Sequence, residues 1–170
     1  MRTTRSELET KFPAIGAAYD FVLPSYTFLA ARFEAADNRL TTLLTLTATL
    51  SLGAPILAGS IRKDISFLSV WFLAAMMSFL ASVIVGLVGR VSGKLTLPDP
   101  MVHFKTSLSD PEWEFKKNAI AFAGKHFAAN SEAILRKGNV AACVAALLVL
   151  EIACLICWIA LAPEWPGITL

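Results

Sequence analysis

The sequence predicts an all-α membrane protein with three transmembrane helices, and three observations lead to that prediction. Apolar residues make up 56% of the 170 residues and charged residues 16%, against roughly a quarter in soluble domains. Mean hydropathy is +0.62. Residues 40–60, 65–89 and 138–162 are each long enough to cross a bilayer core of about 30 Å as a helix, and together they contain one charge, Glu151.

Residues 1–39 are expected to form cytosolic N-terminal helices that lead into the membrane. Pro24 stands at a position suited to the first turn of a helix. The apolar residues after it recur at helical spacing, with charged residues between them, which is typical of an amphipathic helix. These apolar residues are Tyr26, Leu29, Phe33 and Ala36.

The first predicted span, residues 40–60, carries five threonines and one proline. Pro55 removes a backbone donor and clashes with the carbonyl of Ser51, so we expect a kink there. The turn at residues 62–64 is very short, and the second span is therefore expected to run antiparallel to the first.

The second predicted span, residues 65–89, has a small residue at every fourth position. In lipid, rows of small residues allow two helix backbones to approach closely, and close packing drives their association. The row predicts a helix-packing stripe without identifying the partner. Its members are Ala74, Ser78, Ser82 and Gly86.

Residues 90–137 are expected to form a cytosolic loop followed by a long helix. Asp110 and Pro111 are predicted to cap and begin that helix. Its apolar face is predicted to hold Phe115, Ala119, Phe122 and Phe127. With no proline before Pro163, one helix is expected to continue through the third span, residues 138–162, with Gly138 as the site of any bend. Residues 163–170 form a short tail.

The distribution of lysine and arginine predicts the orientation. Thirteen of the fifteen basic residues lie in residues 1–39 and 90–137, and only Arg62 and Lys63 lie between the first two spans. Cytosolic loops carry the excess of basic residues, so the N-terminus is expected in the cytoplasm and the tail in the periplasm. Trp71, Trp158 and Trp165 are then expected at the outer interface as an aromatic belt.

Glu151 stands almost at the midpoint of the third span. An acid at that depth costs about 3 kcal/mol on insertion scales, so it has a partner or a function. One interpretation is a protonated carboxyl that hydrogen-bonds to a threonine or serine of a neighbouring span. The other is a ring of Glu151 side chains around the axis of a homo-oligomer, which would favour cations in a pore.

Other chemistry is sparse. His103 and His126 belong to no metal or triad spacing, and Cys143, Cys154 and Cys157 are expected to be small packing residues. We therefore expect no enzyme, no metal, no cofactor and no nucleic-acid partner. Five basic residues remain candidates for binding an anionic ligand, although the orientation rule already explains their placement. They are Arg32, Arg39, Lys117, Lys125 and Arg136.

Two short motifs carry a family resemblance. Arg32, Asp37 and the basic residue Arg39 lead into the first span, and Asn130 is followed by Leu135, Arg136 and Lys137 before the third. In this layout the chain resembles the Pycsar transmembrane effectors of bacterial anti-phage defence and, more distantly, the SLATT group. The resemblance implies a small inner-membrane protein that is triggered by a cyclic pyrimidine nucleotide and then impairs the membrane of the infected cell.

Two other classes stay open from the residues alone. One is a channel or transporter subunit that works through Glu151 in ordinary physiology. The other is a membrane assembly protein, or scaffold, whose spans only dock a partner along the small-residue stripe.

Overall fold

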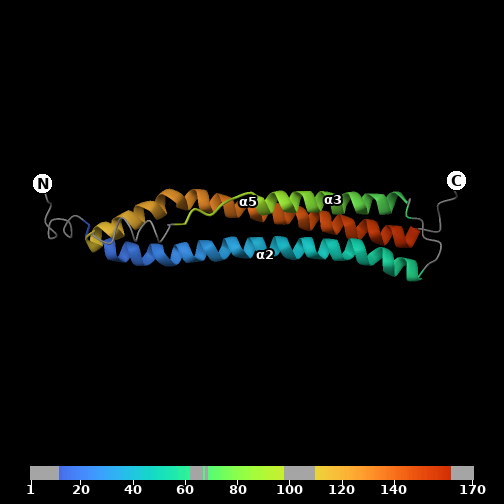
Figure 1. Cartoon of the computed structure of the whole chain (residues 1–170), viewed down its shortest axis with the longest axis horizontal. Coiled ribbons are helices and arrows are strands. Elements are labelled where there is room, and N and C mark those ends of the chain that lie inside the picture. Colours follow the sequence, from blue (N-terminus) through green and yellow to red (C-terminus); the bar gives the residue numbers. More distant parts are fainter. Residues whose placement is uncertain (1–11, 62–66, 68, 98–109, 162–170) are drawn as a thin grey trace. The chain divides into compact units, whose positions relative to one another are not determined.

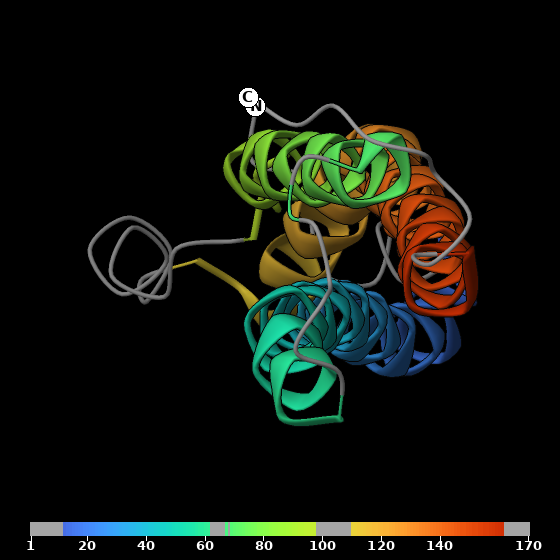
Figure 2. The ribbon, with the colours of Figure 1, turned by 90° about the vertical axis from the view of Figure 1, so that its right-hand side faces the viewer.

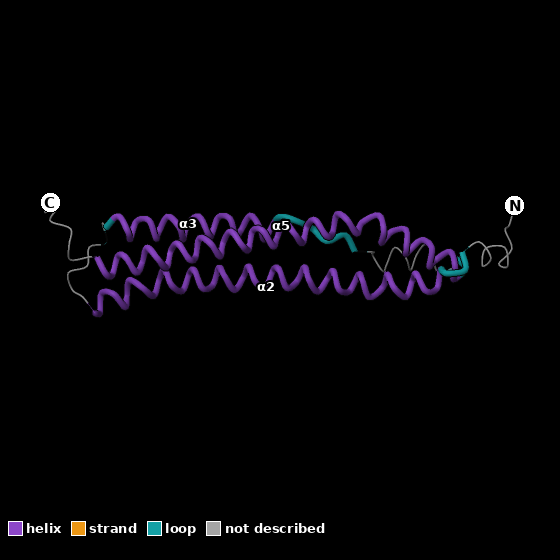
Figure 3. Tube along the Cα trace, turned by 180° about the vertical axis from the view of Figure 1, so that it is seen from behind, coloured by secondary structure: helices purple, strands orange, loops and turns teal. Residues whose placement is uncertain are grey.

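A computed structural model describes residues 12–61, 67, 69–97 and 110–161, and the described residues form three long α-helices. They are α2 (Ile15–Ile61), α3 (Val70–Val91) and α5 (Glu112–Leu161) (Figure 1). The helices account for almost all of the described trace, and the described loop after α3 is a short extended segment (Figure 3). The predicted all-α class is confirmed.

Each of the three helices is long and apolar enough to cross a membrane. The predicted spans 40–60 and 138–162 lie within α2 and α5, apart from Ala162, which falls outside the described residues. By length and composition, this is a multi-pass membrane protein.

The predicted second span, residues 65–89, overlaps α3 over most of its length, and residues 65, 66 and 68 lie outside the described residues. α3 begins at Val70, directly after Ser69, whose backbone is extended with φ −61° and ψ 137°. The helix also continues past residue 89, so that Arg90 lies in its last turn, where a cation interacts favourably with the helix dipole. The short turn predicted at residues 62–64 lies outside the described residues.

The starts of the two long helices also differ from expectation. Pro24 lies in the interior of α2, which begins nine residues earlier at Ile15, and not in a first turn. Next to this proline, the Ser25 hydroxyl donates to the Phe21 carbonyl of the preceding turn at 2.9 Å. α5 begins one residue later than predicted, because the amides of Glu114 and Phe115 both donate to the carbonyl of Pro111.

α2 also continues as one helix through Pro55. The last turns of α2 slope away from its preceding course in Figure 1. α5 is likewise one helix through Gly138.

The chain divides into two compact units. Residues 1–34 and 94–135 form one, which we call the stalk unit, and residues 35–93 and 136–170 form the other, the span unit. α2 and α5 each contribute a segment to both. The apolar stretches that can cross a membrane lie in the span unit.

In the span unit, α2 and α5 run parallel and α3 runs antiparallel to them. Asp37 contacts Lys137 and Ser51 contacts Glu151, so α2 and α5 advance together. In contrast, Ala58 packs with Ala75 while Leu44 lies against Gly86, so numbering rises on α2 as it falls on α3. Figure 2 shows the teal, green and red segments of these helices beside one another.

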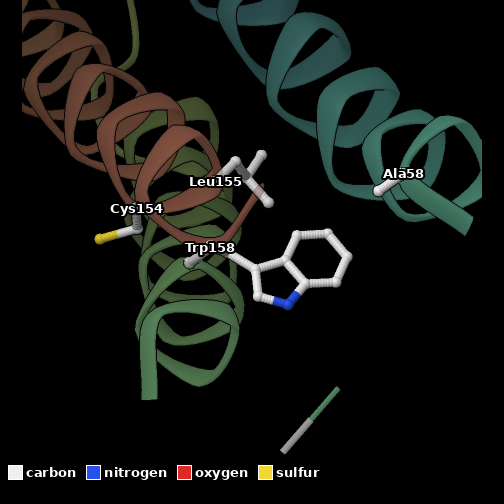
Figure 4. Packing of buried hydrophobic residues seen from close by; sticks show 5 residues of the cluster. Ala58, Cys154, Leu155 and Trp158 are labelled. Atoms are coloured by element: carbon white, nitrogen blue, oxygen red, sulfur yellow. The ribbon is translucent and has the colours of Figure 1, made fainter. Parts of the chain in front are cut away.

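Two apolar clusters hold the span unit together. Leu40 packs with Ala141 and Val144, and further along the helices Ala58 packs with Leu155 and Trp158. Figure 4 shows the Trp158 indole on α5 pointing toward the segment of α2 that carries Ala58. In lipid, such van der Waals packing is a principal source of association between helices.

The aromatic belt at the outer interface stays a prediction. Trp158 is fully buried between helices, with its ring centre 4.7 Å from that of Phe72 and the two rings tilted against each other. A ring of that size contributes more by filling the space between three helices than by exposure. Trp71 is exposed, and Trp165 lies outside the described residues.

Candidate functional site

Glu151 is a fully buried carboxyl in the middle of the span unit. It is 0% exposed, and the Ser51 hydroxyl of α2 donates a hydrogen bond to its Oε1. Its Oε2 is also buried and has no hydrogen-bond partner in the part of the chain that the structure describes. The site is therefore a helix-to-helix contact with one carboxyl oxygen unsatisfied.

This geometry matches the first of the two interpretations of Glu151, a carboxyl bonded to a serine of a neighbouring span. An ionised carboxylate buried away from water is costly unless it is paired, and in the described residues no lysine or arginine pairs with Glu151. The neutral acid fits this environment better. Within one chain Glu151 lines no open path, because its side chain is fully buried.

A second polar contact joins the same two helices near the start of their apolar stretches. The Lys137 ammonium of α5 forms a salt bridge with Asp37 of α2. The Lys137 side chain is 2% exposed and that of Asp37 is 35% exposed. Charge and burial together make this pair a strong constraint on the register of α2 against α5.

The two polar contacts and the two apolar clusters lie along one line, which we call the α2–α5 seam. Ser51 follows Asp37 by the same number of residues as Glu151 follows Lys137, so the helices keep one parallel register over this length. In the span unit, one row of buried residues on α5 alternates steps of four and three residues, the spacing of a coiled-coil seam. The row consists of Lys137, Ala141, Val144, Leu148, Glu151, Leu155 and Trp158, and Cys154 is also buried.

The predicted small-residue stripe is placed differently at one end. Ser78, Ser82 and Gly86 are buried, whereas Ala74 is exposed and Ala75 takes its place. Residues spaced by four drift around an α-helix, because a turn takes 3.6 residues, so the buried face follows steps of three and four. It extends to Gly89.

The chain's own helices cover this face. Ser78 donates to the Leu147 carbonyl at 2.8 Å, and a Cβ added at Gly86 or Gly89 would overlap Leu44 or Val140. A larger residue at either position would have to displace that side chain, and the β-branched Val140 can move less than the end of Leu44. The Ser82 hydroxyl is buried and, among the described residues, has no hydrogen-bond partner.

The stalk unit contains a buried polar contact that the pattern of the sequence did not single out as a site. Asn130 is 1% exposed, and its side-chain amide bonds both backbone groups of Thr96, at 3.0 and 3.1 Å. The Tyr26 hydroxyl lies 3.5 Å from the Asn130 nitrogen. Burial raises the pKa of Tyr26, against a smaller lowering by that hydrogen bond, so the phenol stays protonated near neutral pH.

Asn130 therefore ties the segment after α3 to α5. The only sequence feature that pointed to Asn130 was the second of the two motifs behind the family resemblance, which also contains Lys137. Asp37 stands in the first of these motifs. Three of the motif residues thus make polar contacts within single units, and two of them, Asn130 and Lys137, are buried.

The five candidate anion-binding residues form no single cluster in the structure. All five are exposed, with Arg32, Lys117 and Lys125 in the stalk unit and Arg39 and Arg136 in the span unit. Arg32 lies 5.6 Å from the ring centre of Phe28, and Lys117 lies 5.7 Å from that of Trp113. Two of the cations therefore already rest on aromatic rings.

The remaining candidates differ in burial. Cys154 is buried, Cys157 is half-buried and Cys143 is exposed, all as free thiols. His126 packs its ring 4.5 Å from that of Phe122, and His103 lies outside the described residues. On the predicted apolar face of α5, Phe127 is exposed and Ala123 is buried instead.

Across the described residues, histidine, cysteine and acidic side chains form no group that could hold a metal ion. No protein-family model, no curated protein and no solved structure matches this chain.

Proposed function

We propose that this chain is a small multi-pass effector of the bacterial inner membrane that impairs the membrane when a ligand triggers it, in the setting of anti-phage defence. The proposal places the N-terminus in the cytoplasm and the C-terminus in the periplasm. Three helices able to span a membrane, the one-sided distribution of basic residues and the motif resemblance support it.

The observation that carries the proposal is the enclosure of Glu151. A carboxyl that is 0% exposed at mid-span serves no ion path while the α2–α5 seam is closed. Opening the seam breaks the Ser51 hydrogen bond and uncovers the acid, and in a homo-oligomer several uncovered acids would surround one axis and favour cations. The closed chain is then the resting state and the opened chain the toxic one.

The trigger in this proposal is a cyclic pyrimidine nucleotide, whose phosphate is anionic. Arg32, Lys117 and Lys125 give the stalk unit exposed cations for such a ligand. A ligand shifts an equilibrium only by its differential affinity for the two states. A modest difference in affinity is enough to open the α2–α5 seam, since polar contacts between helices in lipid contribute about 0.6–2 kcal/mol each.

The test measures membrane potential in bacteria that express the protein with and without a co-expressed pyrimidine nucleotide cyclase. The native chain should depolarise the membrane only when the cyclase is present. Glu151→Gln keeps the size and hydrogen bonding of the side chain but carries no charge, so it should insert normally and lose the triggered depolarisation. Glu132→Gln, an exposed acid on the same helix, should behave as the native chain.

Absence of depolarisation by the native chain under any cyclic nucleotide would contradict the effector proposal. A membrane assembly protein is the second candidate, favoured by the same hydrogen bond, because a carboxyl that only packs should tolerate glutamine. Docking of a partner along the small-residue stripe has less support, since the chain's own helices bury Ser78, Ser82 and Gly86. A channel or transporter subunit would instead show steady ion flux without a trigger.

A further inference from the structure

A groove lies on the outer side of the α2–α3 pair, within the span unit. Its volume is about 390 Å³. Leu44 and Leu52 give it apolar walls, three threonines line it along α2, and Arg90 of α3 is the one charged residue among the described residues that line it. The groove is separate from Glu151, none of whose contacts it shares.

The hydroxyl groups of the threonines that line this groove are bonded within α2. Thr41, Thr45 and Thr49 each donate their hydroxyl to the backbone carbonyl four residues earlier, at 3.0, 2.9 and 2.8 Å. A threonine bonded in this way has satisfied its donor on its own helix. The lining is therefore apolar along the helix, although its composition is rich in threonine.

Arg90 lies at one end of the groove. Because α3 runs antiparallel to α2 and Gly86 lies against Leu44, Arg90, one turn after Gly86, falls at the Thr41 end. α3 ends at Val91, so the guanidinium is at the border of the apolar stretch. Among the described residues, no carboxylate forms a salt bridge with Arg90.

The length of the groove corresponds to one leaflet. From Thr41 to Leu52 the helix rises about 16 Å, and half of a typical hydrocarbon core is about 15 Å. A cation at the border and an apolar channel one leaflet deep have the chemistry of a phospholipid, with its phosphate at the cation and one acyl chain along the channel.

We propose that this groove binds one anionic phospholipid, with the Arg90 guanidinium on the phosphate and an acyl chain along Thr41–Leu52. This proposal requires that the chain spans a membrane, but it does not depend on the effector function or on Glu151. The outer face of α2 and α3 would then distinguish between lipids by their headgroups.

The test is native mass spectrometry of the detergent-purified full chain with phosphatidylglycerol or phosphatidylcholine of identical acyl chains. The native chain should retain one phosphatidylglycerol in preference to phosphatidylcholine. Arg90→Gln should lower phosphatidylglycerol retention about tenfold, since charge-assisted hydrogen bonds are the strong ones. Arg39→Gln, which removes an exposed cation of the same unit outside the groove, should leave retention unchanged.

A second variant tests the channel itself. Ala48→Phe fills the groove and should lower the retention of both lipids, and Thr45→Leu serves if the phenylalanine variant does not fold. Equal retention in Arg90→Gln and the native chain would overturn the proposal, as would an equal loss in Arg39→Gln. A change of oligomeric state in Ala48→Phe with unchanged lipid retention would assign the groove to a second copy instead.

Discussion

The stalk unit and the span unit each bury a polar side chain of α5, and the two differ in how completely that side chain is bonded. Asn130 uses both ends of its amide on the backbone of Thr96. Glu151 has one oxygen bonded to Ser51 and the other buried without a partner among the described residues. A satisfied group fixes one structure, whereas a half-satisfied group in low dielectric favours rearrangement.

The two buried contacts are expected to have different roles. The Asn130 contact is expected to be structural and to stay closed in every state of the protein. The Glu151 contact is expected to open, because its loss costs less and uncovers a group with chemistry of its own. Asp37–Lys137 belongs to the span unit but carries charge, so it should resist opening more than Ser51–Glu151 does.

The largest effect is expected at this ion pair. Asp37→Ala removes the carboxylate beside a 2%-exposed lysine, and breaking a buried pair from one side costs about 3 kcal/mol. Lys137→Met removes the buried charge and keeps a side chain of similar length, so it should lower the stability less than Asp37→Ala does. Thermal unfolding of the purified protein in detergent measures both, with Glu34→Ala as an exposed control on α2. Equal melting temperatures for Asp37→Ala and Glu34→Ala would show that the pair does not hold the seam.

The next effect is expected at Asn130. Asn130→Leu leaves the amide and carbonyl of Thr96 without their bonds, at a cost of about 2 kcal/mol. Asn118→Leu makes the same change at an exposed position of α5 and should be nearly neutral. Hydrogen exchange at Thr96 reports the contact directly. Unchanged protection of the Thr96 amide in Asn130→Leu would show that Asn130 does not hold this segment in place.

Two glycines of the span unit should respond to the same substitution with opposite sign. Gly89→Ala places a Cβ against the stiff side chain of Val140 and should destabilise by about 1 kcal/mol. Gly53→Ala meets no atom within 4 Å and should stabilise α2 by up to about 1 kcal/mol. Melting temperatures that move in the same direction would argue against close packing at Gly89.

The smallest effect is expected at Ser51. Ser51→Ala removes one polar contact between helices in the span unit, which contributes about 0.6 kcal/mol on average. Ser60→Ala, whose hydroxyl bonds only its own helix, serves as the control. In the effector proposal Ser51→Ala should lower the amount of trigger needed for depolarisation, since it weakens the resting state. A higher requirement would contradict that role.

Much of the fold follows from the sequence, because uncharged stretches of spanning length and the single acid between them are local features. The partner of Glu151 is not local. The first span offers five threonines and Ser51 as donors, and only the register between α2 and α5 selects Ser51. The threonines bond within their own helix, as Thr45 and Thr49 do with Thr41 and Thr45.

The same limit applies to individual buried residues. Ala74 and Ala75 are equivalent as small residues, and which of them is buried depends on the rotation of α3 against its neighbours. The enrichment of tryptophan at interfaces concerns the depth of Trp158, whereas its burial beside Phe72 and Ala58 depends on how the helices pack. Packing between helices decided these positions, and the sequence of one helix contains little information about it.

The opening of the α2–α5 seam can be tested most directly by locking it. In a chain with its three cysteines replaced by alanine, Leu40→Cys and Ala141→Cys place two thiols in one buried cluster of the seam and leave Glu151 intact. A short, reducible cross-linker between them should abolish cyclase-triggered depolarisation, and reduction should restore it. If the cross-linked chain depolarises the membrane as fully as the reduced chain, the seam does not open and Glu151 stays a packing residue.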